Sequence, residues 1–191
     1  MTRIIAGVHG GRRLSAPAGV QTRPTSDRVR EAFFSSLTAM TDLDGARFAD
    51  LYAGSGAVGL EALSRGANFA LLVESDARAA RIIRDNIVAL RAGAAARLIT
   101  GKVSQVLATP PEGGPFDVVF ADPPYAIPEA EVTAVQEALV ENGWLAEDAV
   151  VVLERATRTP VRGAGLTWVD GITSERSRRY GETTLWYGRR S

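Results

Sequence analysis

The chain has 191 residues, 46% of them hydrophobic, with 22 basic and 22 acidic side chains. That length and apolar content suit one compact core. No apolar run approaches the roughly 18 residues that span a bilayer, and no signal-peptide pattern is present, so we expect a cytoplasmic protein. The absence of cysteine excludes disulfides and a thiolate nucleophile. A single histidine, His9, is too few for an ordinary zinc site, and we expect no bound metal.

Basic residues are concentrated at the two ends of the sequence. Residues 1–40 contain six arginines against two acidic residues, and residues 155–191 contain eight arginines against three. The segment between them, residues 41–154, holds 8 basic and 17 acidic residues. Two basic ends on an acidic body indicate contact with a polyanion such as a nucleic acid.

The first part of the chain is predicted to form an extension to a larger domain. Residues 2–15 alternate in the manner of a β-hairpin, with a glycine-containing turn near His9. A helix with one apolar face is expected to begin near Ser26. We assign residues 1–45 to the extension and residues 46–191 to the larger domain, packed together as one unit.

From residue 46 onward, segments typical of strands and helices alternate. The predicted strands cover residues 47–52, 69–73, 97–100, 116–121 and 149–153, and the predicted helices cover residues 56–65, 76–92, 103–108 and 130–140. Gly66 and Gly93 are expected to end two of the helices. This alternation predicts an α/β fold with a mostly parallel sheet and helices on both faces. Residues 166–169 and 183–187 are predicted to be strands of a final antiparallel hairpin, joined by an arginine-rich turn.

A glycine-rich segment, Asp50–Gly59, follows the first core strand and reads Asp-Leu-Tyr-Ala-Gly-Ser-Gly-Ala-Val-Gly. Between a strand and a helix, this spacing predicts a tight turn at Gly54, close approach of a ligand at Gly56, and close packing of the helix on the strand at Gly59. Glu74 ends the next apolar run, where a carboxylate can accept hydrogen bonds from ribose hydroxyls. The segment therefore predicts a site for a nucleotide-like cofactor, and by itself it suits both NAD and S-adenosylmethionine.

A second motif, Asp122-Pro123-Pro124-Tyr125, follows the fourth core strand. Because the loops after strands one and four face the same crevice in an open α/β sheet, we expect this motif to lie beside the glycine-rich segment. The prolines stiffen the turn and remove two N–H donors, which leaves the Asp122 carboxylate and the Pro123 carbonyl as a pair of acceptors. Such a pair matches the two N–H donors of an exocyclic amino group on a nucleobase, and Tyr125 offers a face for base stacking.

Together the two motifs favour S-adenosylmethionine, because a methyl group on a sulfonium needs little more than alignment with a nucleophilic amine. Asp50, four residues before Gly54, also suits the charged amine of an amino acid. An NAD-dependent oxidoreductase is the alternative from another enzyme class, and a non-catalytic RNA-binding assembly factor is a third hypothesis. Methylation of adenine N6 or cytosine N4 in DNA would use similar chemistry, although the sequence has no separate domain for reading a DNA sequence.

Three further segments carry a resemblance to a known family: Arg3–Gly7, Arg23–Phe34 and Arg179–Thr183. With these segments and the two motifs, the chain resembles the RsmD-type bacterial methyltransferases of guanine N2 in small-subunit (16S) ribosomal RNA, over essentially its whole length. The resemblance implies a Rossmann-like, S-adenosylmethionine-dependent methyltransferase with a seven-stranded sheet and an N-terminal β-hairpin. It also implies that the partner is small-subunit ribosomal RNA or a partly assembled small subunit.

The resemblance, together with the motifs, implies which residues form the site. Those expected to bind the cofactor follow the core strands: Asp50, Ala53, Gly54, Ser55, Gly56, Glu74, Ser75, Lys102 and Val103. Those expected to act on the target guanine are Asp122, Pro123 and Tyr125. Five arginines are expected to contact RNA: Arg12, Arg13, Arg23, Arg178 and Arg179. Lys102 departs from the family, which usually has a polar or acidic residue at that position.

Overall fold

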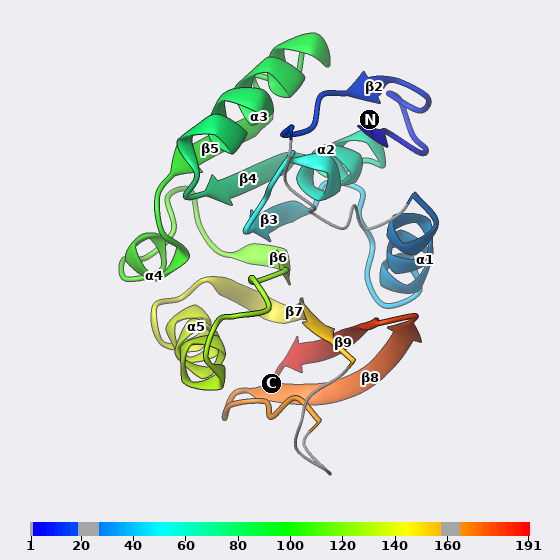
Figure 1. The fold of residues 1–191 in the computed structure, drawn as a ribbon. Coiled ribbons are helices and arrows are strands. Elements are labelled where there is room, and N and C mark those ends of the chain that lie inside the picture. Colours follow the sequence, from blue (N-terminus) through cyan, green and yellow to red (C-terminus); the bar gives the residue numbers. More distant parts are fainter. Residues whose placement is uncertain (1, 19–26, 158–164) are drawn as a thin grey trace.

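The computed structural model describes residues 2–18, 27–157 and 165–191 and shows an α/β fold built on a seven-stranded sheet (Figure 1). The strands lie in the order β5-β4-β3-β6-β7-β9-β8. They are β3 (Arg47–Leu51), β4 (Phe69–Glu74), β5 (Ala96–Thr100), β6 (Phe116–Ala121), β7 (Leu145–Ala156), β8 (Ile172–Tyr180) and β9 (Thr183–Arg190). The helices are α1 (Asp27–Thr38), α2 (Ala57–Ser64), α3 (Ala77–Ala89), α4 (Val103–Val106) and α5 (Glu129–Glu141). Neighbouring strands run parallel except at β9, which is antiparallel to both β7 and β8.

Helices cover both faces of the sheet because the central strands carry apolar side chains on both sides. On one face, α1, α2 and α3 pack against residues such as Phe48, Leu72 and Val150. On the other face, α4 and α5 pack against the alternate residues, such as Leu71 and Val151. This arrangement confirms the predicted fold class. None of the helices in the described ranges is both long and apolar enough to cross a membrane.

The N-terminal extension contributes to the core. Strands β1 (Thr2–Arg3) and β2 (Arg13–Leu14) form a short antiparallel pair, as predicted. Ile4 and Leu14 are buried in a cluster with α2 and α3. Helix α1 buries Phe33 in an apolar cluster with side chains of β3, β6 and β7. Both parts of the extension therefore pack on the same face of the sheet.

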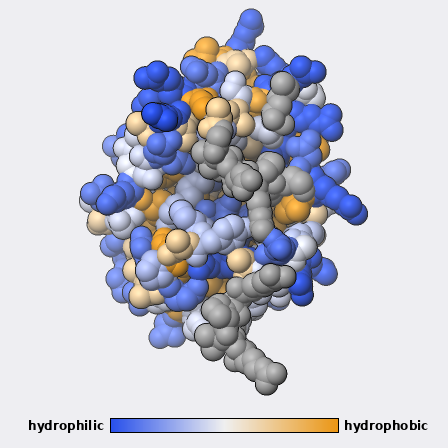
Figure 2. Space-filling model, in the orientation of Figure 1, coloured by the Kyte–Doolittle hydropathy of each residue, from blue (hydrophilic) through white to orange (hydrophobic). Residues whose placement is uncertain are grey.

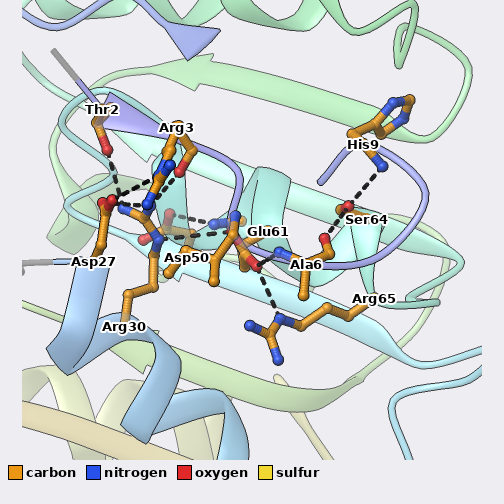
Figure 3. A network of polar contacts seen from close by, with 12 residues as sticks. Thr2, Arg3, Ala6, His9, Asp27, Arg30, Asp50, Glu61, Ser64 and Arg65 are labelled. Atoms are coloured by element: carbon orange, nitrogen blue, oxygen red, sulfur yellow. Dashed lines mark hydrogen bonds and ion pairs between the residues drawn. The ribbon is translucent and has the colours of Figure 1, made fainter. Parts of the chain in front are cut away.

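A buried ion pair fastens the extension to the larger domain (Figure 3). Arg30 on α1 and Glu61 on α2 are 2% and 0% exposed, and Arg30 Nε lies 3.7 Å from Glu61 Oε2. Burial lowers the pKa of Arg30, and the charge of Glu61 opposes that shift. Glu61 also accepts hydrogen bonds from the backbone N–H groups of Ile5 (2.8 Å) and Ala6 (3.0 Å). The start of the chain is thus held against the helix that follows the glycine-rich loop.

The C-terminal hairpin differs from the prediction in its first strand. The arginine-rich stretch belongs to strand β8 itself, and the turn lies at Gly181, which has a φ of 60°. Residues 166–169 form no strand, and Trp168 packs against the core from this loop. The prediction was wrong because β8 is an edge strand with most of its side chains exposed, so it lacks the apolar alternation that marks a half-buried strand.

Of the two helix ends predicted at glycines, one lies where it was predicted. Gly66 follows α2 with a φ of 115°, as predicted, but α3 ends at Ala89, before Gly93. Arg91 adopts a left-handed backbone with a φ of 54° and takes the role expected of the glycine. The predicted start of the first helix, Ser26, lies outside the described residues.

Candidate active site

The glycine-rich loop connects the carboxyl end of β3 to α2 (Figure 1). Gly54 and Gly56 both have left-handed backbones, with φ of 60° and 81°. A Cβ on Gly56 would lie 3.0 Å from Leu72 Cδ2, and a Cβ on Gly59 would lie 3.2 Å from the Cβ of Asp50. The structure therefore shows the predicted turn at Gly54 and the predicted close packing of α2 on the sheet at Gly59, and the approach of a ligand to Gly56 stays a prediction.

Two carboxylates hold this loop. Asp50 is 1% exposed and accepts a hydrogen bond from the N–H of Gly59 at 2.9 Å. Burial raises the pKa of Asp50 to about 7 in spite of this hydrogen bond, and the charge of Glu74 raises it further. The two oxygens of Glu74 accept hydrogen bonds from the N–H groups of Gly54 (2.7 Å) and Asp76 (2.9 Å). Because a carboxylate oxygen can accept more than one hydrogen bond, Glu74 retains the capacity to bind hydroxyl groups.

A cavity of about 400 Å³ opens at the carboxyl ends of β4 and β5. Its lining includes four of the residues predicted to bind the cofactor: Glu74, Ser75, Lys102 and Val103. The segment after β6 forms another part of the wall through Pro124 and Ile127. A cavity of this size, lined by apolar side chains and by the carboxyl groups of Glu74 and Glu131, suits a nucleoside.

Tyr52 lines the same cavity and was not singled out in the sequence. Its φ of 65° is unusual for a residue with a side chain, and such backbones tend to occur at functional sites. Burial raises the pKa of Tyr52 to about 12, and the charge of Glu131 adds to the effect. Tyr52 therefore presents an uncharged ring and hydroxyl to the cavity.

The second predicted motif begins where β6 ends. Asp50 pairs with Phe120 across β3 and β6, so Asp122 lies two residues beyond this pair, on the same face of the sheet as Asp50. Burial raises the pKa of Asp122 well above its ordinary value. The charges of Glu154 and Asp50 raise this pKa further, and Arg155 opposes the effect. The two motifs meet at one edge of the sheet, as the topological argument predicts.

Tyr125 stands at the surface of the motif, whereas Pro123 is buried. The tyrosine side chain is 52% exposed. Its hydroxyl lies 3.5 Å from Thr183 Oγ1 at the start of β9, and Thr183 pairs with Ala156 of β7. The ring therefore extends from the end of β6 across the end of β7, with a large area open to a ligand.

The structure separates the predicted RNA-binding arginines into two exposed groups. The hairpin arginines (Arg12 and Arg13) lie on the N-terminal hairpin, and the edge-strand arginines (Arg178 and Arg179) lie on β8. The hairpin packs over β4. Strands β4 and β8 are five strand spacings apart in the sheet, or about 24 Å. Figure 2 shows hydrophilic side chains projecting around the rim of the face in view. Arg23 lies outside the described residues.

Comparison with known proteins agrees with this architecture. The family described as "Conserved hypothetical protein 95" matches residues 2–189. The chain belongs to this family. It is 38% identical over 166 residues to ribosomal RNA small subunit methyltransferase D of Escherichia coli K12, and the alignment covers 87% of this chain and 80% of the relative. It is also 37% identical over 154 residues to the putative rRNA methyltransferase YlbH of Bacillus subtilis strain 168, and that alignment covers 80% of this chain and 81% of the relative.

Among solved structures, the putative methyltransferase yhhF from Escherichia coli superposes with a TM-score of 0.83 and 34% sequence identity. The match covers 100% of this chain and 98% of that protein. Family membership and these similarities confirm the resemblance drawn from the sequence, and the methyltransferase fold with it.

Asn86 on α3 joins the glycine-rich loop of this family member to its N-terminal hairpin. Asn86 is 2% exposed, and its Nδ2 donates hydrogen bonds to the carbonyls of Ser55 (2.9 Å) and Ser15 (3.0 Å). Its Oδ1 accepts a hydrogen bond from the N–H of Ser15 at 2.8 Å. Nothing in the helical pattern of the sequence distinguishes Asn86 from other polar positions, so it was not predicted.

Glu154 is a third site residue that was not predicted from the sequence. It is 5% exposed, and it follows the apolar run of β7 as Asp122 follows that of β6. The signal was present, since Glu74 and Asp122 were chosen for the same position relative to their strands. Although Asp50, Asp122 and Glu154 lie on neighbouring strands, no group of three or more acidic or histidine side chains among the described residues is arranged to hold a metal ion.

Proposed function

We propose that this protein transfers the methyl group of S-adenosylmethionine to the exocyclic N2 amino group of a guanine in small-subunit ribosomal RNA. The observation that carries the proposal is the position of Asp122-Pro123 at the end of β6, immediately beside the glycine-rich loop at the end of β3. A pair of acceptors for an amino group thereby adjoins a cavity suited to a nucleoside cofactor. The similarity to ribosomal RNA methyltransferases supports RNA as the substrate.

The proposed cofactor fits the residues around the cavity and the loop. Glu74 accepts hydrogen bonds from the ribose hydroxyls, while Lys102 and Val103 border the adenine. The loop of residues 53–56 binds the methionine end, and its glycines leave room for close approach. Asp50 holds this loop through Gly59, and its ionised form, which predominates above its pKa of about 7, attracts the positively charged amine. Bound there, S-adenosylmethionine supplies a methyl group that its sulfonium charge already activates.

The target amino group is held by the second motif. The Asp122 carboxylate and the Pro123 carbonyl each accept one of its two N–H groups, which aligns the nitrogen lone pair with the methyl group. Stacking of the base on Tyr125 contributes about 1–3 kcal/mol. As the new N–C bond forms, the bond between sulfur and the methyl group breaks and S-adenosylhomocysteine is the leaving group. The nitrogen then releases one proton, which Asp122 takes up because its pKa is raised by burial.

The basic groups position the RNA in this proposal. Residues 1–45 form an RNA-binding extension to the catalytic domain of residues 46–191. The hairpin arginines and the edge-strand arginines bind phosphates on either side of the site, and Arg23 remains a predicted contact. The substrate is the RNA alone or within a partly assembled small subunit, in the cytoplasm.

Transfer of labelled methyl from S-adenosylmethionine to RNA, free and in small subunits, followed by nucleoside analysis, tests the proposal. We expect N2-methylguanosine from the wild-type protein and a rate at least about 100-fold lower from Asp122→Ala, which lacks the acceptor. Asp85→Ala, which removes an exposed carboxylate on α3, serves as the control and should keep wild-type activity. Equal transfer by the wild-type and Asp122→Ala proteins would refute the assignment of the site. Binding to a nicotinamide column without binding of S-adenosylhomocysteine would favour an oxidoreductase instead.

A further inference from the structure

We infer that Glu154 accepts a hydrogen bond from N1–H of the target guanine and so selects guanine over adenine and cytosine, an inference that rests on the proposed function. Glu154 lies in β7, next to β6, and Phe120 pairs with Val152 between these strands. Asp122 and Glu154 each lie two residues beyond that pair, on the same face of the sheet. Neighbouring strands are about 4.8 Å apart, so the two carboxyl groups are adjacent.

The position of Glu154 relative to the cofactor cavity fits a role toward the base. The cavity lies at the ends of β4 and β5, on one side of Asp122, whereas Glu154 lies on the other side, in β7. The hydroxyl of Tyr125, 3.5 Å from Thr183 Oγ1, brings the tyrosine ring over the end of β7. A base stacked on this ring therefore lies over both carboxyl groups.

The chemistry of the base edges gives the second carboxylate a specific use. Guanine presents two adjacent donors, N1–H and the N2 amino group, on its Watson–Crick edge. Adenine and cytosine instead present an amino group next to a ring nitrogen that carries a lone pair. The acceptor pair of Asp122 and Pro123 matches any exocyclic amino group. A carboxylate beside that pair attracts N1–H of guanine and repels the ring nitrogen of the other two bases.

Burial strengthens this discrimination. Glu154 is 5% exposed, so a base that reaches it has left water, as a flipped base does. In such a place an unmatched lone pair has no water to compensate it. The charge of Glu154 raises the pKa of Asp122 more than the charge of Asp50 does, and the positive charge of Arg155 opposes both. Because Asp122 and Glu154 also follow paired residues on neighbouring strands, the two carboxyl groups are placed to read one base edge together.

The test uses 2-aminopurine, which keeps the amino group on C2 but has a lone pair at N1. Small-subunit RNA carries either guanine or 2-aminopurine at the methylated nucleotide, located beforehand by nucleoside mapping. We expect the wild-type kcat/KM for guanine RNA to exceed that for 2-aminopurine RNA by about 10- to 100-fold. In Glu154→Gln, whose amide can donate to N1, this ratio should fall by about tenfold or more. Glu147→Gln removes an exposed carboxylate from the same strand and should keep the wild-type ratio.

Four results separate the possibilities. Equal use of the two RNAs by an active wild-type enzyme would overturn the inference. An unchanged ratio in a Glu154→Gln protein that still binds S-adenosylhomocysteine would also overturn it and would assign N1–H to Asp122. If Glu154→Gln does not fold, Glu154→Asp, which keeps the charge but withdraws it by one methylene, must lower the ratio for the inference to stand. A wild-type protein that forms no N2-methylguanosine would refute the proposed function, and this inference with it.

Discussion

The pH dependence of stability should reveal the buried proton on Asp50. Asp50 is 1% exposed, and its pKa of about 7 compares with an ordinary value of 3.8. In the unfolded chain the carboxyl group ionises near its ordinary pKa, whereas in the folded protein it keeps its proton up to about pH 7. The substitution Asp50→Asn keeps the shape, leaves an amide oxygen to accept the hydrogen bond from Gly59, and removes the ionisation.

The sign and the size follow from proton linkage. Between about pH 4 and pH 7 the folded wild-type protein binds a proton that the unfolded chain has lost, so the free energy of unfolding falls as the pH rises through this window. The two pKa values differ by roughly 3, and each pKa unit corresponds to about 1.4 kcal/mol, so the loss due to Asp50 is about 4 kcal/mol. The Asp50→Asn protein does not lose this stability, because its amide does not ionise. Its stability relative to wild type should therefore rise by about 4 kcal/mol between pH 4 and pH 7.5.

Urea unfolding followed by circular dichroism, at half-unit steps from pH 4 to pH 8, measures this difference. The control is Asp85→Asn, which changes an exposed carboxylate on α3 and should follow wild type at every pH. A difference between Asp50→Asn and wild type that stays constant across the range would show that Asp50 is already ionised in the folded protein. Burial would then not govern the ionisation of this carboxyl group.

Three further predictions concern groups that hold the site in place. Glu61→Gln should lower the free energy of unfolding by about 3 kcal/mol in urea titrations, because it leaves the buried charge of Arg30 poorly compensated. Asn86→Leu leaves the carbonyl of Ser55 without its donor, so calorimetry should show weaker binding of S-adenosylhomocysteine together with a stability loss of about 2 kcal/mol. Replacement of both edge-strand arginines by alanine should reduce the slope of log K against log salt for RNA binding by about 1.5, without changing cofactor affinity.

The sequence predicted the buried strands better than the exposed one, for a physical reason. Strand β6 begins and ends where it was predicted, because it is buried on both faces and appears as an apolar run, broken only by Asp117, between a Pro-Gly loop and two prolines. Strand β8 pairs along one edge only and exposes most of its side chains. Its backbone hydrogen bonds to β9 stabilise it without any apolar pattern, so periodicity could not detect it.

The site was predictable where it depends on positions at strand ends. Asp50, Glu74 and Asp122 all follow from the rule that ligands bind beyond the carboxyl ends of parallel strands. Tyr52 could not be selected, because its left-handed backbone is set by the turn and leaves no trace in the residue type. Asn86 could not be selected either, since its hydrogen bonds join segments 31 and 71 residues away.

The order of strands in the sheet explains where the unevenly distributed charges of the sequence lie in the structure. The acidic middle of the chain supplies the carboxyl groups of β3, β6 and β7, which gather at one buried edge around Asp122. The basic ends supply the two exposed arginine groups, one on the hairpin that packs over β4 and one on the edge strand β8, on either side of that edge. An RNA backbone is attracted to the arginines and repelled by the carboxyl groups, so its phosphates remain at the flanks. The acidic centre can instead bind an uncharged base that carries hydrogen-bond donors. The charge distribution therefore favours a flipped nucleotide, whose base enters the site while its phosphates stay outside.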